Sequence, residues 1–157
     1  MEPRTGIAGL TSSFKESIAD LPPGSKVAFI GSVAVCTPFA ELLSYAVKDL
    51  GFKLIYVPKA DLAQARNIVW IENVGFSASG DAADPKGADA IVVLGGLAMP
   101  KFGCPVDMVK SAITVISDGK NAKVIGVCFM SIFERNGWTK ELPFNKVIDA
   151  TMTVQMT

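Results

Sequence analysis

The 157-residue chain contains no histidine. This absence excludes the commonest general base, the Ser–His and Cys–His couples, and every metal site with an imidazole ligand. Only three cysteines are present, an odd number, so we expect reduced thiols rather than a disulfide framework. An excess of charge is also lacking, because 15 basic residues balance 15 acidic ones. A nucleic-acid or membrane-surface partner would favour a basic patch, so we expect neither.

A long uninterrupted hydrophobic run is missing as well. The nearest candidate, Val27 to Ala40, is broken by Gly31 and Pro38 and falls short of the ~18 residues of a membrane span. Residues 1–6 lack the basic-then-apolar pattern of a secretory signal, so we expect a cytoplasmic protein. What the chain does have is a hydrophobic content of 50%, which indicates one well-covered core.

The spacing of apolar residues predicts how the chain begins. Apolar positions three and four apart indicate an amphipathic helix over residues 6–20. We expect residues 1–24 to form this helix and a linker, and residues 26–154 to form the sheet and covering helices of a single α/β domain spanning 1–157. The apolar run 26–30 is typical of a strand covered on both faces, and a helix with Thr37 as its N-cap should follow it.

The rest of the chain continues this alternation of strands and helices. The pattern predicts further strands at 52–57, 68–71, 88–94, 124–128 and 146–154, helices at 105–118 and 130–136, and a surface loop at 75–87. The last strand should lie at an edge of the sheet. Together these elements predict a three-layer α/β fold with a flavodoxin-like or Rossmann-like, mostly parallel sheet of five to six strands.

Small and polar residues gather in the loops that follow three of the predicted strands. Ligands of parallel sheets bind at the carboxyl ends of the strands, where hydroxyl groups and backbone amides can hold an anion. We therefore predict a site for a small anionic or nucleotide-like ligand, although for the first loop taken alone a tight strand-to-helix turn with a capping threonine is the favoured explanation. No cofactor is specified by this pattern. The candidate ligand-binding residues are Gly31, Ser32, Thr37, Gly95, Gly96 and Ser131.

All three cysteines also fall at these strand ends. If the strands are neighbours, Cys36, Cys104 and Cys128 could form a three-thiolate site for a metal or an iron–sulfur cluster. The alternative is that each is a small buried apolar residue, and the absence of C-x-x-C spacing favours this alternative, with no metal bound. Cys128 is also a candidate nucleophile, because a strand end followed by a helix can lower the pKa of a thiol.

Two segments resemble the class I glutamine amidotransferase-like superfamily. Ala88–Gly96 is similar to its strand with a following glycine pair, and Val124–Cys128 is similar to the strand that leads to its nucleophilic cysteine. The resemblance spans about residues 26–137 and is closest to the branch of small thiol stress proteins and cysteine-dependent hydrolases. It implies an α/β fold with Cys128 at the catalytic position. The superfamily's histidine is absent here, and Met130 stands where it normally has a glycine.

The chain as a whole also resembles a small archaeal family of uncharacterised proteins, through the segment Val93–Pro100. That resemblance implies a fold and a prokaryotic cytoplasm, and no activity. Three functions stay open at this point. They are a small-molecule-binding protein, a cysteine-dependent enzyme or thiol sensor using Cys128, and a non-catalytic homo-oligomeric interaction protein. In the last case, the N-terminal helix and the edge strand 146–154 would bury surface in a homodimer.

Overall fold

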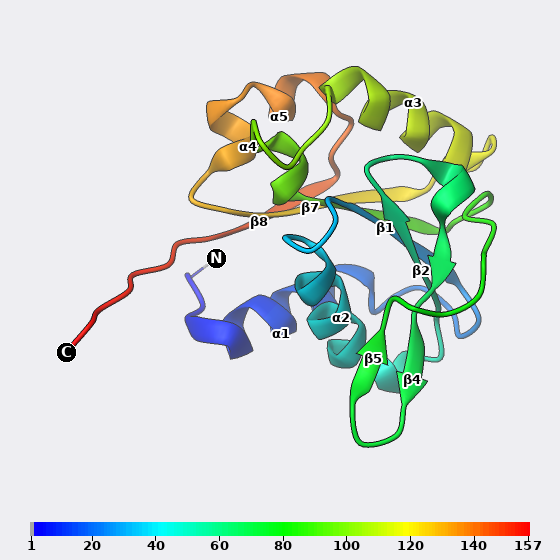
Figure 1. Cartoon of the computed structure of the whole chain (residues 1–157), viewed down its shortest axis with the longest axis horizontal. Helices are drawn as coiled ribbons and strands as arrows, with labels where there is room; N and C mark the ends of the chain where they lie inside the picture. The colour runs from blue at the N-terminus through cyan, green and yellow to red at the C-terminus, as the bar shows by residue number, and fades with distance from the viewer. Residues whose placement is uncertain (1) are drawn as a thin grey trace.

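Five parallel strands form the centre of the computed structural model, which describes residues 2–157. They are β1 (Lys26–Gly31), β2 (Lys53–Pro58), β6 (Ala90–Leu94), β7 (Lys123–Phe129) and β8 (Lys146–Ala150). A sixth strand, β3 (Arg66–Asn67), pairs antiparallel with β2. The order across the sheet is β3-β2-β1-β6-β7-β8 (Figure 1). The prediction of an α/β fold with a mostly parallel sheet of five to six strands is confirmed.

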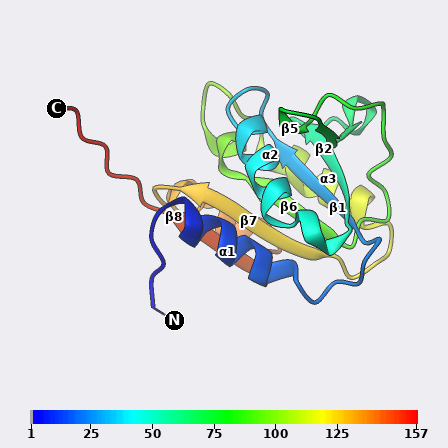
Figure 2. The same cartoon turned by 90° about the horizontal axis from the view of Figure 1, so that it is seen from below.

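Helices cover both faces of the sheet. One face carries α1 (Gly6–Ile18) and α2 (Thr37–Ala46), and the other carries α3 (Val106–Ser117), α4 (Ile132–Arg135) and α5 (Trp138–Glu141) (Figures 1 and 2). Alternate side chains of each strand enter the two cores, because successive residues of a strand point to opposite faces. The three-layer arrangement is therefore confirmed. Within residues 2–157, no helix is both long enough and apolar enough to cross a membrane.

The winding of the sheet reverses between β1 and β6. The chain places β2 on one side of β1, returns to place β6 on the other side, and then adds β7 and β8 in sequence. This is the flavodoxin-like order, in which ligands bind outside the carboxyl ends of the strands at the switch point. Here that point lies between Gly31 at the end of β1 and Leu94 at the end of β6. The neighbouring strand β7 ends at Phe129.

The predicted strand 68–71 is present as three residues, but residues 75–77 differ from the prediction. The sequence pattern predicts a loop from residue 75 onward, but β4 (Val69–Ile71) and β5 (Gly75–Ser77) form a separate antiparallel hairpin that projects from the body (Figure 1). The rings of Trp70 and Phe76 meet edge to face across it, with centroids 5.3 Å apart. A cross-strand pair of this kind stabilises a short hairpin. The three residues of β5 are too few for their periodicity to indicate a strand.

Two helix starts also differ from the prediction. Cys36, not Thr37, occupies the N-cap of α2, and no side-chain hydrogen bond caps that helix. The predicted helix 130–136 is present as the shorter α4, which begins at Ile132 because Met130 and Ser131 adopt left-handed backbone angles with φ of 56° and 58°. The sequence did not predict α5, which follows it. Three short 3-10 turns complete the fold: η1 (Lys48–Leu50), η2 (Leu62–Gln64) and η3 (Gly95–Ala98).

The last strand is shorter than the prediction of 146–154. β8 does lie at an edge of the sheet, but it ends at Ala150. Residues 151–157, which we call the C-terminal tail, continue without secondary structure and run away from the body of the molecule (Figures 1 and 2). β8 pairs with β7, and no further strand of the described chain covers its outer edge.

Candidate functional site

At the switch point, the loop after β1 packs tightly against η3. Ser32 is fully buried, and its hydroxyl lies 3.1 Å from the Cys36 sulfur. A Cβ atom added to Gly96 would lie 2.5 Å from that sulfur and 2.7 Å from the Ser32 hydroxyl oxygen. Contacts this short would force the two loops to move apart, so glycine permits their close approach. Three of the predicted residues are thus brought together, but in a closed contact.

A small cavity remains beside this contact. Its volume is about 90 Å³, which is room for about three water molecules and well below the ~300–1,000 Å³ of typical small-molecule sites. The walls are mainly apolar. They are formed by Val35, Cys36, Phe39, Leu94, Gly95, Gly96, Met99, Val127, Phe129 and Ile132. The switch point therefore holds no space for a nucleotide in this structure.

Two further predicted residues lie nearby in different roles. A Cβ atom on Gly31 would lie 2.5 Å from Cys36 Cβ and 2.6 Å from the hydroxyl oxygen of Tyr56, so Gly31 permits close packing. The Tyr56 hydroxyl donates to the Ser32 carbonyl oxygen at 2.7 Å, which ties the loop to β2. Thr37 begins α2 and is half-buried.

A polar cluster lies at the carboxyl ends of β7 and β8. The parallel register places Cys128 beside Asp149. The Cys128 thiol donates to Asp149 Oδ1 at 3.5 Å, the Ser131 amide donates to the same oxygen at 3.0 Å, and the Ser131 hydroxyl donates to Oδ2 at 2.8 Å. Asp149 thus holds the left-handed turn at Met130 and Ser131. Sequence reasoning missed Asp149, whose only signal was its place in the predicted strand 146–154.

The environment of Cys128 favours the protonated thiol. Burial raises the pKa of Cys128 to about 11. The backbone N–H groups of Phe133 and Ile132 oppose this shift, whereas the Asp149 carboxylate adds to it. At neutral pH the group is therefore a hydrogen-bond donor, whereas a nucleophilic cysteine acts as a thiolate. The role of Cys128 as a nucleophile stays a prediction.

The three cysteines do not form the three-thiolate site considered from the sequence. Cys36 packs in the core on the α1 and α2 side of the sheet, whereas Cys128 and the half-buried Cys104 belong to the core on the opposite side. All three are free thiols. Across residues 2–157, no three His, Cys, Asp or Glu side chains are grouped so that they could hold a metal ion. Loops from one edge of the sheet can fold over either face, which sequence spacing does not reveal.

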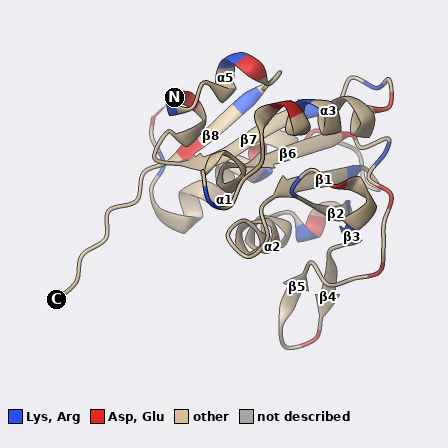
Figure 3. Cartoon of the chain, turned by 45° about the horizontal axis from the view of Figure 1, so that its top comes forward, with Lys and Arg blue, Asp and Glu red and all other residues tan. Residues whose placement is uncertain are grey.

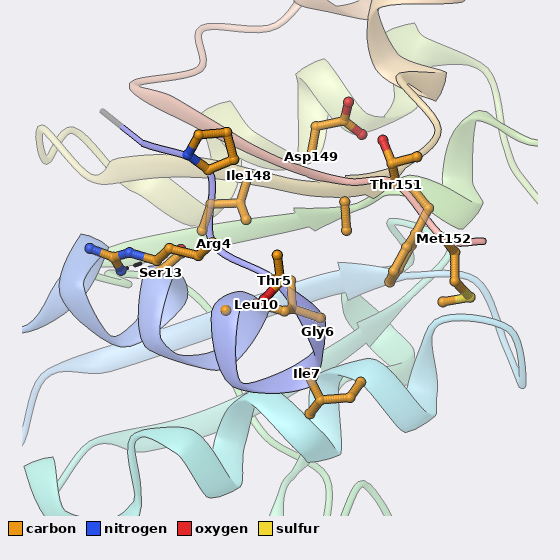
Figure 4. A pocket seen from close by; sticks show the side chains of 14 residues that line it. Arg4, Thr5, Gly6, Ile7, Leu10, Ser13, Ile148, Asp149, Thr151 and Met152 are labelled. Atoms are coloured by element: carbon orange, nitrogen blue, oxygen red, sulfur yellow. Dashed lines mark hydrogen bonds between the residues drawn. The ribbon is translucent and has the colours of Figure 1, made fainter. Parts of the chain in front are cut away.

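A larger hollow lies elsewhere, between α1 and β8 (Figure 4). Two adjoining hollows of about 690 and 430 Å³ share walls at Pro3, Arg4, Ser13, Ile148 and Asp149. Together they run from Lys146 to Met152, along the whole of β8, and we call them the β8 groove. Arg4 pairs with Glu16 and donates to the Ser13 hydroxyl at 3.4 Å along its α1 side.

The outer edge of β8 faces this groove with unpaired backbone groups. The Met130 amide donates to the Ala150 carbonyl oxygen at 2.9 Å, so the backbone groups of Ala150 point toward β7. Because these directions alternate along a strand, those of Val147 and Asp149 point outward. Sequence reasoning found the edge strand but not the groove, because its walls come from opposite ends of the chain.

Comparison with known proteins places this architecture in one archaeal group. The model of a family described as an uncharacterised protein conserved in archaea (DUF2124) matches residues 5–153. An uncharacterised protein of Methanocaldococcus jannaschii, MJ1183, is 40% identical over 99% of this chain and 92% of the relative. An uncharacterised protein of Methanothermobacter thermautotrophicus is 34% identical, over 92% of this chain and 89% of the relative.

A solved structure extends this relationship to the fold. The crystal structure of a protein of unknown function from Methanothermobacter thermautotrophicus superposes with a TM-score of 0.89 at 31% sequence identity. The match covers 100% of this chain and 96% of the other. The two proteins therefore share the same fold. The chain therefore belongs to the DUF2124 family of proteins conserved in archaea.

Proposed function

We propose that the chain is an interaction protein that binds an extended polypeptide segment along β8. The observation that carries this proposal is the open β8 edge, flanked along its length by the β8 groove. An edge strand presents a row of N–H and C=O groups that can pair with a strand from another molecule. In such strand addition, backbone hydrogen bonds provide affinity, and pockets for alternate side chains provide specificity.

The dimensions and the chemistry of the groove support this mode of binding. Five strand residues span about 17 Å, and the groove is lined by every residue of β8. Its floor contains the apolar side chains of Leu10, Ile148 and Phe129, while Arg4 and Glu16 lie at its polar margin. A bound strand would direct alternate side chains onto the apolar floor and keep its polar side chains in water.

α1 contributes a wall of this groove and not an apolar face for a partner. Its side chains Leu10, Phe14 and Ile18 are buried against the sheet of the same chain. Of the two elements that the sequence offers for self-association, the helix is therefore already packed internally, whereas the edge strand still has one free side. The proposed binding surface is the edge strand with its groove.

A peptide-selection experiment tests this function. The full chain is used to select 12-residue peptides from a random display library, and the enriched peptides are measured against Val147→Pro. Proline removes the outward N–H of Val147 but is tolerated at the open side of an edge strand. We expect enriched peptides with alternating apolar residues and an affinity about fivefold weaker for the variant, since a backbone hydrogen bond is worth roughly 1 kcal/mol.

The control for that experiment is the thermal unfolding midpoint of Val147→Pro, which should stay close to that of the native chain. If the chain enriches no peptide at concentrations where light scattering shows it to be a monomer, or if the enriched peptides bind both proteins equally, strand addition at β8 is wrong.

A small-molecule ligand at the carboxyl ends of β1, β6 and β7 is the second candidate function. It is favoured by the cavity beside the buried Ser32 and the Gly95–Gly96 turn. A volume of about 90 Å³ limits the ligand to a few heavy atoms, so a small anion fits this candidate better than a nucleotide.

A further inference from the structure

We infer that the segment bound along β8 is the C-terminal tail of a second copy of this chain, exchanged within a two-fold symmetric dimer. This inference rests on the proposed function and names its partner. The starting observation is that the tail leaves β8 directly and projects from the body of its own molecule (Figures 1 and 2). The Met152 amide contacts the Met130 sulfur at 3.4 Å, and beyond it the tail is exposed.

The tail has the sequence of a strand without the pairing of one. From Thr151 it reads Thr, Met, Thr, Val, Gln, Met, Thr, which alternates polar and apolar residues and is rich in β-branched side chains. It carries no charged side chain (Figure 3). Nevertheless Val154 is 82% exposed and Met156 is 99% exposed. Apolar side chains in this pattern are typical of a strand that is completed by a partner.

The alternation of side chains places the apolar side of the tail on the correct face. Ile148 packs against the core on the α1 side of the sheet, so Met152, Val154 and Met156 continue that same face when the strand is extended. Met152 and Ile148 both line the β8 groove (Figure 4). A tail that adds to β8 with this face toward α1 therefore directs its apolar side chains into the groove.

With two-fold symmetry, the tail of each copy pairs with β8 of the other copy. Opposite residues of antiparallel strands point to the same face, so a pairing centred on Ala150 sets Met152 of one copy opposite Ile148 of the other. Each copy has one open edge strand and one unpaired tail, and the tail follows the edge strand directly in the chain. The pairing uses the same residues from both molecules, as an isologous interface requires. A seven-residue tail spans about 24 Å, enough to cover the about 17 Å of the partner's β8.

Light scattering coupled to size-exclusion chromatography tests this inference on the full chain. We expect a dimer at tens of micromolar, and a monomer when the chain is ended at Ala150. In the full-length variant Val154→Lys, a charge would have to enter the apolar groove, so the dimer dissociation constant should rise by at least about tenfold. The matched control is Val33→Lys, since Val33 is 62% exposed in the loop after β1, away from β8. This control should leave the dimer unchanged.

The possible outcomes distinguish a failure of the tail exchange from a failure of the proposed strand binding at β8. A full chain that is monomeric over the whole concentration range, or a dimer that survives removal of residues 151–157, overturns the tail exchange. Equal effects of Val154→Lys and Val33→Lys overturn it as well. If the chain is monomeric but selected peptides bind in a manner that Val147→Pro weakens, the tail exchange is wrong and strand binding at β8 stands. If selection also fails, both are wrong.

Discussion

Cys128 lies at the end of a buried strand with a carboxylate as its hydrogen-bond acceptor. A thiol that donates to Asp149 is stabilised in its protonated form, because loss of the proton would set two negative charges side by side. The same carboxylate accepts two hydrogen bonds from Ser131. The three residues are therefore a connected structural unit, and each constrains the chemistry of the others.

Alkylation rates should reflect this difference in environment. At pH 8 we expect iodoacetamide to label the half-buried Cys104 before the fully buried Cys128, with the sites resolved by peptide mass spectrometry. The labelling rate of Cys128 should continue to rise above pH 10, because burial raises its pKa to about 11. Preferential labelling of Cys128 with an apparent pKa below the ~8.5 of free cysteine would instead support the thiol enzyme or sensor suggested by the sequence.

At the scale of elements, the contact between η3 and the loop after β1 depends on a missing side chain. We expect Gly96→Ala to lower the free energy of unfolding by about 1–3 kcal/mol, as overpacking typically does, because the new methyl group would meet the Cys36 sulfur and the Ser32 hydroxyl. Urea denaturation measures this loss. In a Cys36→Ala background the sulfur is absent, so the cost of Gly96→Ala should be smaller. An equal cost in both backgrounds would show that the contact with Cys36 is not responsible.

Elements with enough residues for a clear period could be predicted from the sequence, whereas the pairing of the shorter strands could not. The apolar runs of β1, β6 and β7 and the helical stripe of α3 are visible locally, because burial on one or two faces dictates their residues. The left-handed Gly51, with φ of 73°, ends its helical segment, as glycine commonly does. β3 has two residues, and β4 and β5 have three each, so their pairing depends on contacts that local patterns do not contain.

Less of the candidate site than of the fold could be predicted from the sequence. The sequence identified Ser32, Gly96 and Ser131 as residues at strand ends, and the structure places them there. Whether such residues enclose a cavity or fill it depends on how the loops pack, which is a long-range property. The β8 groove was beyond prediction for the same reason, since it forms where residues 3–17 meet residues 146–152.

For the whole molecule, the buried thiol of Cys128 and the buried phenol of Tyr56 predict a loss of stability at high pH. Burial raises the pKa of Cys128 to about 11, and it also raises the pKa of Tyr56 above the usual value of 10. Between about pH 9 and 11 the unfolded chain loses protons that the folded chain retains, so the free energy of unfolding must fall as pH rises. About two pKa units at Cys128 correspond to a loss of roughly 2–3 kcal/mol.

Urea denaturation at pH 8, 9.5 and 11 measures this slope. We expect Cys128→Ala to be less stable at pH 8 but to show a flatter decline toward pH 11, because the titrating thiol has been removed. A decline as steep as that of the native chain would show that Cys128 does not contribute. Below pH 8 the contribution of Cys128 is fully present, so it adds no pH dependence there.

The two edge strands of the sheet differ in whether they can pair with a strand of another molecule. At the β3 edge, the Asn67 amide donates to the Asp81 carbonyl oxygen and the Gly80 amide donates to the Asn67 carbonyl oxygen. Arg66 also forms an antiparallel β-bridge with Ala82. Residues 80–82 therefore already cover that side. A sheet that can be lengthened only at β8 adds one neighbour and then presents two covered outer edges. Assembly through β8 therefore stops at a finite particle, whereas a sheet open on both sides could continue into a filament.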